Sequence, residues 1–163
     1  MNFLKFNRLK SIVDSVFVPD GSGGVMQKYD SIDMRGMSPL VSAYIGDAYY
    51  NLYVRSRLLS YEQHKVNVLN RYGAQMVSAV WQSRAYEAIE PTLTDEERDI
   101  FRRGRNAHSH APRAASFAEY HASTGFEALL GELYLSERFD RLNELCEASF
   151  QYISKEMAKK HKK

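Results

Sequence analysis

Two acidic side chains, Asp47 and Glu127, occupy positions where helical patterning leaves little room for charge. Asp47 lies in the middle of an apolar run over residues 40–59, and Gly46 directly precedes it. An unpaired carboxylate in apolar surroundings costs several kcal/mol. Glycine in a helix interior is also unfavourable, by about 1 kcal/mol. Two unfavourable residues in succession indicate a functional site in which Asp47 has a partner.

Glu127 lies at the border of an apolar helical stripe, one turn from Gly131, whereas Glu132 is expected to point to solvent. The stripe consists of Phe126, Leu129, Leu130, Leu133 and Tyr134. A small residue beside a carboxylate repeats the arrangement of Gly46 and Asp47. We therefore expect the two helices to cross there and to bring Asp47 and Glu127 together.

Two carboxylates that share a pocket repel one another unless one is protonated or a cation lies between them. Hard oxygen ligands in polar surroundings favour Mg²⁺. A carboxylate-bound Mg²⁺ can support phosphodiester hydrolysis without a serine or cysteine nucleophile. An alternative stays open on spacing alone: Asp47 pairs with a buried arginine or caps a helix, and Glu127 is an ordinary boundary residue.

The elements that must position these acids are predicted to be helices. Ser38 can cap a helix that begins at Pro39 and continues to Leu59, and its apolar residues lie nearly all the way round, so we expect it to be buried. Further helices are expected at about Val66 to Ile89, Thr94 to Gly104, Ser116 to Ser136 and Phe139 to Met157. No segment alternates with period two, so the fold class is predicted to be all-α.

The chain of 163 residues fits one domain, and its 44% hydrophobic and 26% charged residues exclude disordered and transmembrane classes. We expect an N-terminal extension over residues 1–30 with a Gly-rich joint, a catalytic domain over 31–157 and a basic tail over 158–163. The start lacks the apolar run of a secretory signal, and the single cysteine, Cys146, has no disulfide partner in the chain. Both features favour the cytoplasm, with Cys146 in the core.

A basic segment is the candidate nucleic-acid contact, because residues 100–118 contain no acid although the whole chain carries only +2. We predict that it binds RNA phosphates through Arg103, Arg105, Asn106 and Arg113. A solvated basic helix end, stabilised by the helix dipole, is the structural alternative. His108 and His110 lack further ligands and make a weak case for zinc.

Three segments resemble the catalytic domain of the ribonuclease III family in its short Mini-III form. They are Ala43-Tyr44-Ile45-Gly46-Asp47-Ala48, Arg103-Gly104-Arg105-Asn106-Ala107 and Ser123-Thr124-Gly125-Phe126-Glu127-Ala128-Leu129-Leu130-Gly131. Their order and spacing agree with that family over about residues 37–152. The resemblance implies an all-helical, homodimeric endonuclease that cuts double-stranded RNA with Mg²⁺, or with Mn²⁺ as a substitute, leaving a 5′-phosphate.

The resemblance places Asp47 and Glu127 on the family's catalytic, metal-binding acids. It further implies maturation of precursor 23S ribosomal RNA, with a large-subunit ribosomal protein as a helper. Two additional acids of the longer enzymes fall on Ala43 and Thr124 here, and His121 replaces an arginine usual in Mini-III. A non-catalytic RNA-binding or ribosome-assembly protein that has kept the fold is the alternative function, and a helical interaction domain is a third.

Overall fold

The computed structural model describes residues 16–34, 36–107 and 116–160. Contacts divide the chain into two units, Met1–Asp33 and Met34–Lys163, and each is described by itself. In the described part of the first unit, Pro19 and Val25 form an isolated antiparallel bridge. The Asp20 carboxylate accepts hydrogen bonds from the Ser22 and Gly24 backbone N–H groups, at 2.8 and 3.0 Å. The Gly-rich segment is therefore a hydrogen-bonded turn.

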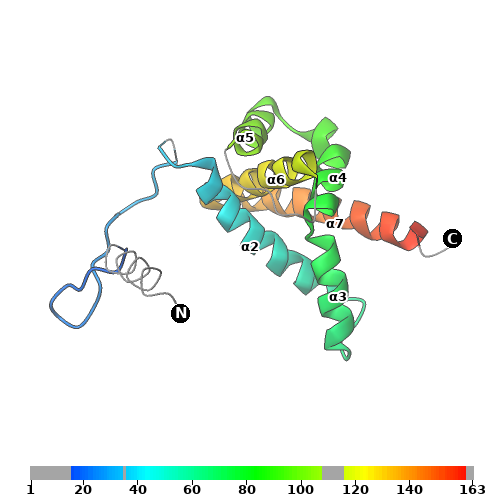
Figure 1. The fold of residues 1–163 in the computed structure, drawn as a ribbon, viewed down its shortest axis with the longest axis horizontal. Helices are drawn as coiled ribbons and strands as arrows, with labels where there is room; N and C mark the ends of the chain where they lie inside the picture. Colours follow the sequence, from blue (N-terminus) through cyan, green and yellow to red (C-terminus); the bar gives the residue numbers. More distant parts are fainter. Residues whose placement is uncertain (1–15, 35, 108–115, 161–163) are drawn as a thin grey trace. The chain divides into compact units, whose positions relative to one another are not determined.

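Within its described residues, the second unit consists of helices joined by short loops and contains no strand (Figure 1). In chain order it contains α2 (Pro39–Leu58), α3 (Val66–Met76), α4 (Ala79–Ile89), the 3-10 turn η1 (Glu90–Thr92), α5 (Asp95–Arg105), α6 (Phe117–Leu135) and α7 (Phe139–Lys160). The prediction of an all-α fold is confirmed. Within the described ranges, no helix is both long enough and apolar enough to cross a bilayer.

Capping side chains fix where three of these helices begin. Ser38 accepts from the Leu40 backbone N–H at 3.3 Å, and Pro39 is the first residue of α2, as predicted. Thr94 forms a capping box at the start of α5, and Ser116 forms another at the start of α6. These bonds satisfy N–H groups that a helix N-terminus otherwise leaves unpaired.

The prediction of one continuous helix over residues 66–89 is wrong. The chain leaves the helical conformation at Val77, which ends α3, and Ser78 is extended, with φ −70° and ψ 151°, ahead of α4. Neither residue is a glycine or a proline, so the sequence carries no strong breaking signal at this point. Because the helix is interrupted here, the axis of α4 can take a different direction from that of α3. As a result, α4 packs against both α6 and α7, whereas α3 contacts mainly α2.

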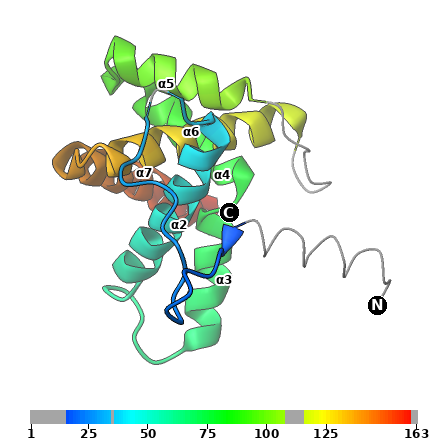
Figure 2. The same cartoon turned by 90° about the vertical axis from the view of Figure 1, so that its left-hand side faces the viewer.

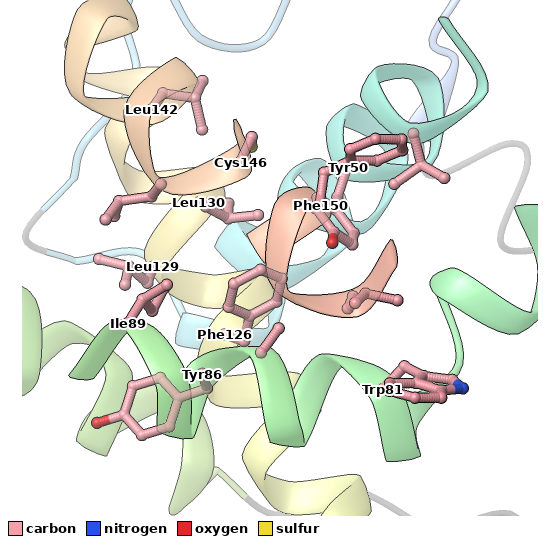
Figure 3. Close-up of a cluster of buried hydrophobic side chains, with 14 of the residues drawn as sticks. Tyr50, Trp81, Tyr86, Ile89, Phe126, Leu129, Leu130, Leu142, Cys146 and Phe150 are labelled. Atoms are coloured by element: carbon pink, nitrogen blue, oxygen red, sulfur yellow. The ribbon is translucent and has the colours of Figure 1, made fainter. Parts of the chain in front are cut away.

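Helix α6 is the central element of the unit, packed against α2, α4, α5 and α7 (Figures 1 and 2). Its side chains Phe126, Leu129 and Leu130 are fully buried in one core. Figure 3 shows the partners that surround them: Tyr50 from α2, Trp81, Tyr86 and Ile89 from α4, and Leu142, Cys146 and Phe150 from α7. Cys146 is buried, as expected of a core residue.

Two glycines allow α2 and α6 to cross at very short range. A Cβ atom at Gly46 would overlap the carbonyl oxygen of Glu127 and lie 2.7 Å from the Gly131 nitrogen. A Cβ at Gly131 would in turn overlap the carbonyl oxygen of Ser42. Only glycine at both positions lets the two backbones touch. The crossing predicted from the paired glycines is therefore present, and it places Asp47 beside the helix that carries Glu127.

One expectation for α2 is wrong: the helix is not buried all the way round. Its inner face is buried at Tyr50 and Val54, whereas Val41, Tyr44 and Leu52 are 46%, 75% and 64% exposed. The helix lies at the edge of its unit, so only one side can reach the core. The remaining apolar side forms an exposed face on the described chain.

Candidate functional site

The Asp47 side chain lies on the exposed side of the crossing between α2 and α6. Asn51, one turn later in α2, donates from its amide Nδ2 to Asp47 Oδ1 at 2.9 Å and to the Asp47 carbonyl oxygen at 3.0 Å. Partial burial of the carboxyl raises the pKa of Asp47, and the bond from Asn51 opposes that shift. The partner that the sequence required is therefore an amide on the same helix, and it brings no positive charge.

Glu127 is more deeply placed than Asp47, at the middle of α6. Burial raises the pKa of Glu127 to about 8, the negative charge of Asp47 raises it further, and the nearby Gln82 amide partly opposes both effects. The two carboxyl groups therefore interact electrostatically across the crossing of α2 and α6. The structure brings together the two acids that the sequence predicted to meet.

No cation within the described chain neutralises this acid pair. Neither Asp47 nor Glu127 takes part in an ion pair among the described residues. The described side chains also contain no group of three or more His, Cys, Asp or Glu that could hold a metal ion. Two neighbouring carboxylates suit Mg²⁺, which usually keeps several waters and takes only one or two carboxylates from the protein.

Gln82 is a residue of this site that the sequence prediction missed. Its side chain is completely buried on α4, and neither amide atom has a hydrogen-bond partner among the described residues. The amide lies near enough to the Glu127 carboxyl to lower its pKa, but outside the geometry of a hydrogen bond. A signal was available, because Gln82 occupies the helical stripe that continues with Ala85, Tyr86 and Ile89.

The two positions that carry further acids in longer ribonuclease III enzymes contribute no carboxylate here. Ala43 is buried at the crossing face of α2. Thr124 is also buried, and its hydroxyl donates to the Tyr120 carbonyl oxygen at 3.1 Å. That hydroxyl is engaged within its own helix. The acidic part of the site in the described chain is thus the pair of Asp47 and Glu127.

Three of the four predicted RNA-binding residues, Arg103, Arg105 and Asn106, lie at the C-terminal end of α5. Arg103 is half exposed and pairs with Glu132 of α6 at 3.1 Å. The expectation that Glu132 points to solvent is therefore wrong, because α5 packs over that side of α6. Asn106 is exposed and caps α5. Arg113 lies outside the described residues, as do His108 and His110.

Arg105 is exposed and lines an open cavity of about 520 Å³ between α4, α5 and α6. Its carbonyl oxygen lies 2.7 Å from His121 Nδ1, so the residue that replaces the expected arginine fastens the end of α5 to α6. Arg98 and Arg102, also in the cavity wall, pair with Asp95 and Asp99 respectively. Of the three arginines that line this cavity, Arg105 is therefore the one that forms no ion pair among the described residues.

A pH-dependent stability follows from the raised pKa of Glu127. Without metal, the folded protein keeps the Glu127 proton up to a pKa of about 8, whereas the unfolded chain releases it near the ordinary value of 4.5. The free energy of unfolding should therefore fall as pH rises between these values. We expect Glu127→Gln to stabilise the metal-free protein by about 4 kcal/mol at pH 8 and by less than about 0.5 kcal/mol at pH 4.5.

Urea denaturation in EDTA at several pH values measures this difference. Glu87→Gln, at an exposed position on α4, is the matched control and should behave as the wild type throughout. Equal stability of Glu127→Gln and wild type at pH 8 would show that the pKa of Glu127 is not raised in the folded protein.

Comparison with known proteins shows to which family the chain belongs. The family model of the Ribonuclease III domain matches residues 40–138. A Mini-ribonuclease 3 from Symbiobacterium thermophilum is 46% identical over 120 residues, which cover 73% of this chain and 92% of the relative. A Mini-ribonuclease 3 from Thermoanaerobacter sp. is 43% identical over 118 residues, covering 72% and 83%.

A solved structure supports the same relationship at the level of the fold. The crystal structure of a protein from Fusobacterium nucleatum superposes with a TM-score of 0.67 at 30% sequence identity, and the match covers 74% of this chain and 98% of that protein. The family match contains Asp47, Glu127 and the helices that hold them. The chain therefore belongs to the ribonuclease III family and is an endoribonuclease.

Proposed function

We propose that this endoribonuclease cleaves double-stranded RNA with Mg²⁺ held by Asp47 and Glu127, and that it matures precursor 23S ribosomal RNA in the cytoplasm. The observation that carries the proposal is that the charge of Asp47 acts on the Glu127 carboxyl across the helix crossing, while neither acid has an ion pair in the described chain. Burial, and then the charge of Asp47, raise the pKa of Glu127 to about 8, which favours its protonated form at neutral pH in the metal-free protein. A divalent cation bound between the two acids would favour the ionised form of Glu127 instead.

The protein's own groups prepare this site in three ways. Asn51 holds one Asp47 oxygen by a 2.9 Å hydrogen bond and so restricts the orientation of the carboxylate. The glycine crossing fixes the separation of α2 and α6. The partly buried setting of Glu127 strengthens the attraction between its carboxylate and a cation, because charges interact more strongly where water is less accessible. When bound, the cation would supply a Lewis acid for phosphodiester hydrolysis and stabilise the leaving oxygen.

The substrate is proposed to contact the end of α5. Double-stranded RNA hides its base edges, so a protein recognises it through phosphates, 2′-hydroxyls and shape. Arg105 and Asn106 are exposed there and can reach phosphates, whereas Arg103 must exchange its pairing with Glu132 to do so. Arg113 is proposed to extend this contact. Cleavage should weaken steeply with rising salt and should depend little on sequence.

A homodimer is proposed to form through the exposed apolar face of α2. Val41, Tyr44 and Leu52 are exposed on it, and a groove of about 330 Å³ lined by Leu52 and Leu59 continues it toward Val66 of α3. A contiguous apolar surface of this kind marks an interaction site. A second copy would bury this face and extend the surface that contacts RNA. We further propose that a large-subunit ribosomal protein helps to present the substrate.

The function is tested with two RNAs of one sequence, a perfectly paired duplex and its single strand. We expect the protein to cut the duplex in Mg²⁺, to leave 5′-phosphate ends, and to spare the single strand. EDTA should stop cleavage, and added Mg²⁺ or Mn²⁺ should restore it. Cleavage in EDTA, or equal cleavage of the single strand, would contradict the proposal. Binding of the duplex without cleavage in Mg²⁺ would contradict its catalytic part.

A further inference from the structure

Gln82 combines complete burial with an amide that lacks hydrogen-bond partners. Its side chain is 0% exposed, and both Nε2 and Oε1 are without partners among the described residues. An unsatisfied buried polar group costs about 1 to 3 kcal/mol. Most buried polar groups in folded proteins are hydrogen-bonded, so such an exception calls for an explanation in function.

The place of this amide supplies the explanation. Gln82 lies on α4, which packs against α6, and its amide lies beside the Glu127 carboxyl. The exposed carboxylate of Asp47 and the buried amide of Gln82 both act on the Glu127 carboxyl. An amide N–H is suited to an ionised carboxylate, because a hydrogen bond to a charged acceptor is about twice as strong as one between neutral groups.

We propose that Gln82 is a positioning residue for the acid pair, whose Nε2 donates to the ionised Glu127 carboxylate and turns it toward a divalent cation shared with Asp47. The inference rests on the proposed function. The second amide atom, Oε1, is an acceptor that can hold a water of that cation. Groups that orient metal-binding carboxylates in this way typically contribute 10 to 100-fold to metal affinity or activity.

A purely structural role fits Gln82 poorly. An amide that stabilised the core would bond to backbone or side-chain groups, and this one bonds to neither within the described residues. An apolar side chain of the same shape would fill the position without an unpaired donor and acceptor. The amide has a use at this position when Glu127 is ionised by a bound cation, because its N–H can then donate to the charged carboxylate.

The test replaces Gln82 by methionine, which keeps the length of the side chain and removes the amide. Mn²⁺ alone is titrated into the metal-free protein and followed by electron paramagnetic resonance of the free ion. We expect Gln82→Met to bind Mn²⁺ about 10 to 100-fold more weakly than wild type. Its free energy of unfolding in EDTA should be equal or higher, because an unpaired buried amide is lost.

Ser149→Ala is the matched control. The Ser149 hydroxyl is also completely buried without a partner in the described chain, but it lies on α7, which carries neither acid. It should leave Mn²⁺ affinity unchanged. Cleavage by Gln82→Met should be reduced at low Mg²⁺ and recover at saturating Mg²⁺, which a misfolded site would not do. If methionine prevents folding, Gln82→Leu provides the same comparison.

The outcomes separate this inference from the function on which it rests. Wild-type Mn²⁺ affinity in a folded Gln82→Met protein would overturn the role of Gln82 and leave the proposed function intact. Weakened affinity that Ser149→Ala reproduces would also overturn it. A wild-type protein that neither binds Mn²⁺ nor cuts duplex RNA would overturn the proposed function, and the inference with it.

Discussion

Replacing Asp47 by asparagine is expected to slow cleavage of duplex RNA by at least about 1000-fold, while the metal-free protein stays as stable as the wild type or becomes more stable. The loss of one of two carboxylates weakens cation binding and transition-state stabilisation, and about 4 kcal/mol of that stabilisation corresponds to a factor of 1000. The gain in stability has a separate cause. The neutral amide no longer repels Glu127, whose pKa the charge of Asp47 raises.

Two measurements on one preparation check this expectation: single-turnover cleavage in Mg²⁺ and urea denaturation in EDTA. Asp140→Asn, an exposed aspartate in the first turn of α7, is the control and should leave cleavage unchanged. If Asp47 were half of a structural ion pair, Asp47→Asn would instead lower stability markedly. Full cleavage by Asp47→Asn would remove Asp47 from the active site.

Replacing Gly131 by alanine is expected to destabilise the protein by about 3 kcal/mol or more. The added Cβ would overlap the Ser42 carbonyl oxygen and lie 2.6 Å from the Ser42 carbonyl carbon and 3.0 Å from the Gly46 nitrogen. These are backbone atoms of α2, so relief requires the two helices to move apart. The same movement would separate Asp47 from Glu127, and cleavage should be lost in whatever fraction remains folded.

Gly73→Ala is the control for this prediction. Gly73 lies inside α3, and a Cβ there would meet only Leu58 Cδ1 at 3.7 Å, an ordinary contact. Alanine at that position should raise stability by about 0.5 to 1 kcal/mol. Denaturation by urea measures both variants. A Gly131→Ala protein as stable as the wild type would show that α2 and α6 do not cross at this close range.

Local signals in the sequence were sufficient for the helix starts and for the acid pair. Ser38 and Thr94 cap helices as predicted, because capping depends on neighbours within one turn. The meeting of Asp47 and Glu127 was predictable because each acid has a glycine nearby, and paired small residues favour a close crossing. This inference needed no knowledge of the remaining fold.

The errors have a different origin, because each depends on tertiary contacts. Val77 and Ser78 carry no strong breaking signal, yet packing of α4 on α6 and α7 bends the chain between them. The apolar face of α2 around Tyr44 has the same pattern as a core face, although it is exposed in this chain. Gln82 stands on an apolar stripe, but only the fold reveals that Glu127 is its neighbour.

The most direct test of the acid pair as a cation site is the number of protons released when Mn²⁺ binds at pH 7. Isothermal titration calorimetry in two buffers of different ionisation enthalpy measures that number. Because the pKa of Glu127 is raised to about 8, we predict release of about one proton per bound ion at pH 7, falling toward zero above pH 9. Binding without proton release, or undiminished binding by Asp47→Asn, would contradict the account.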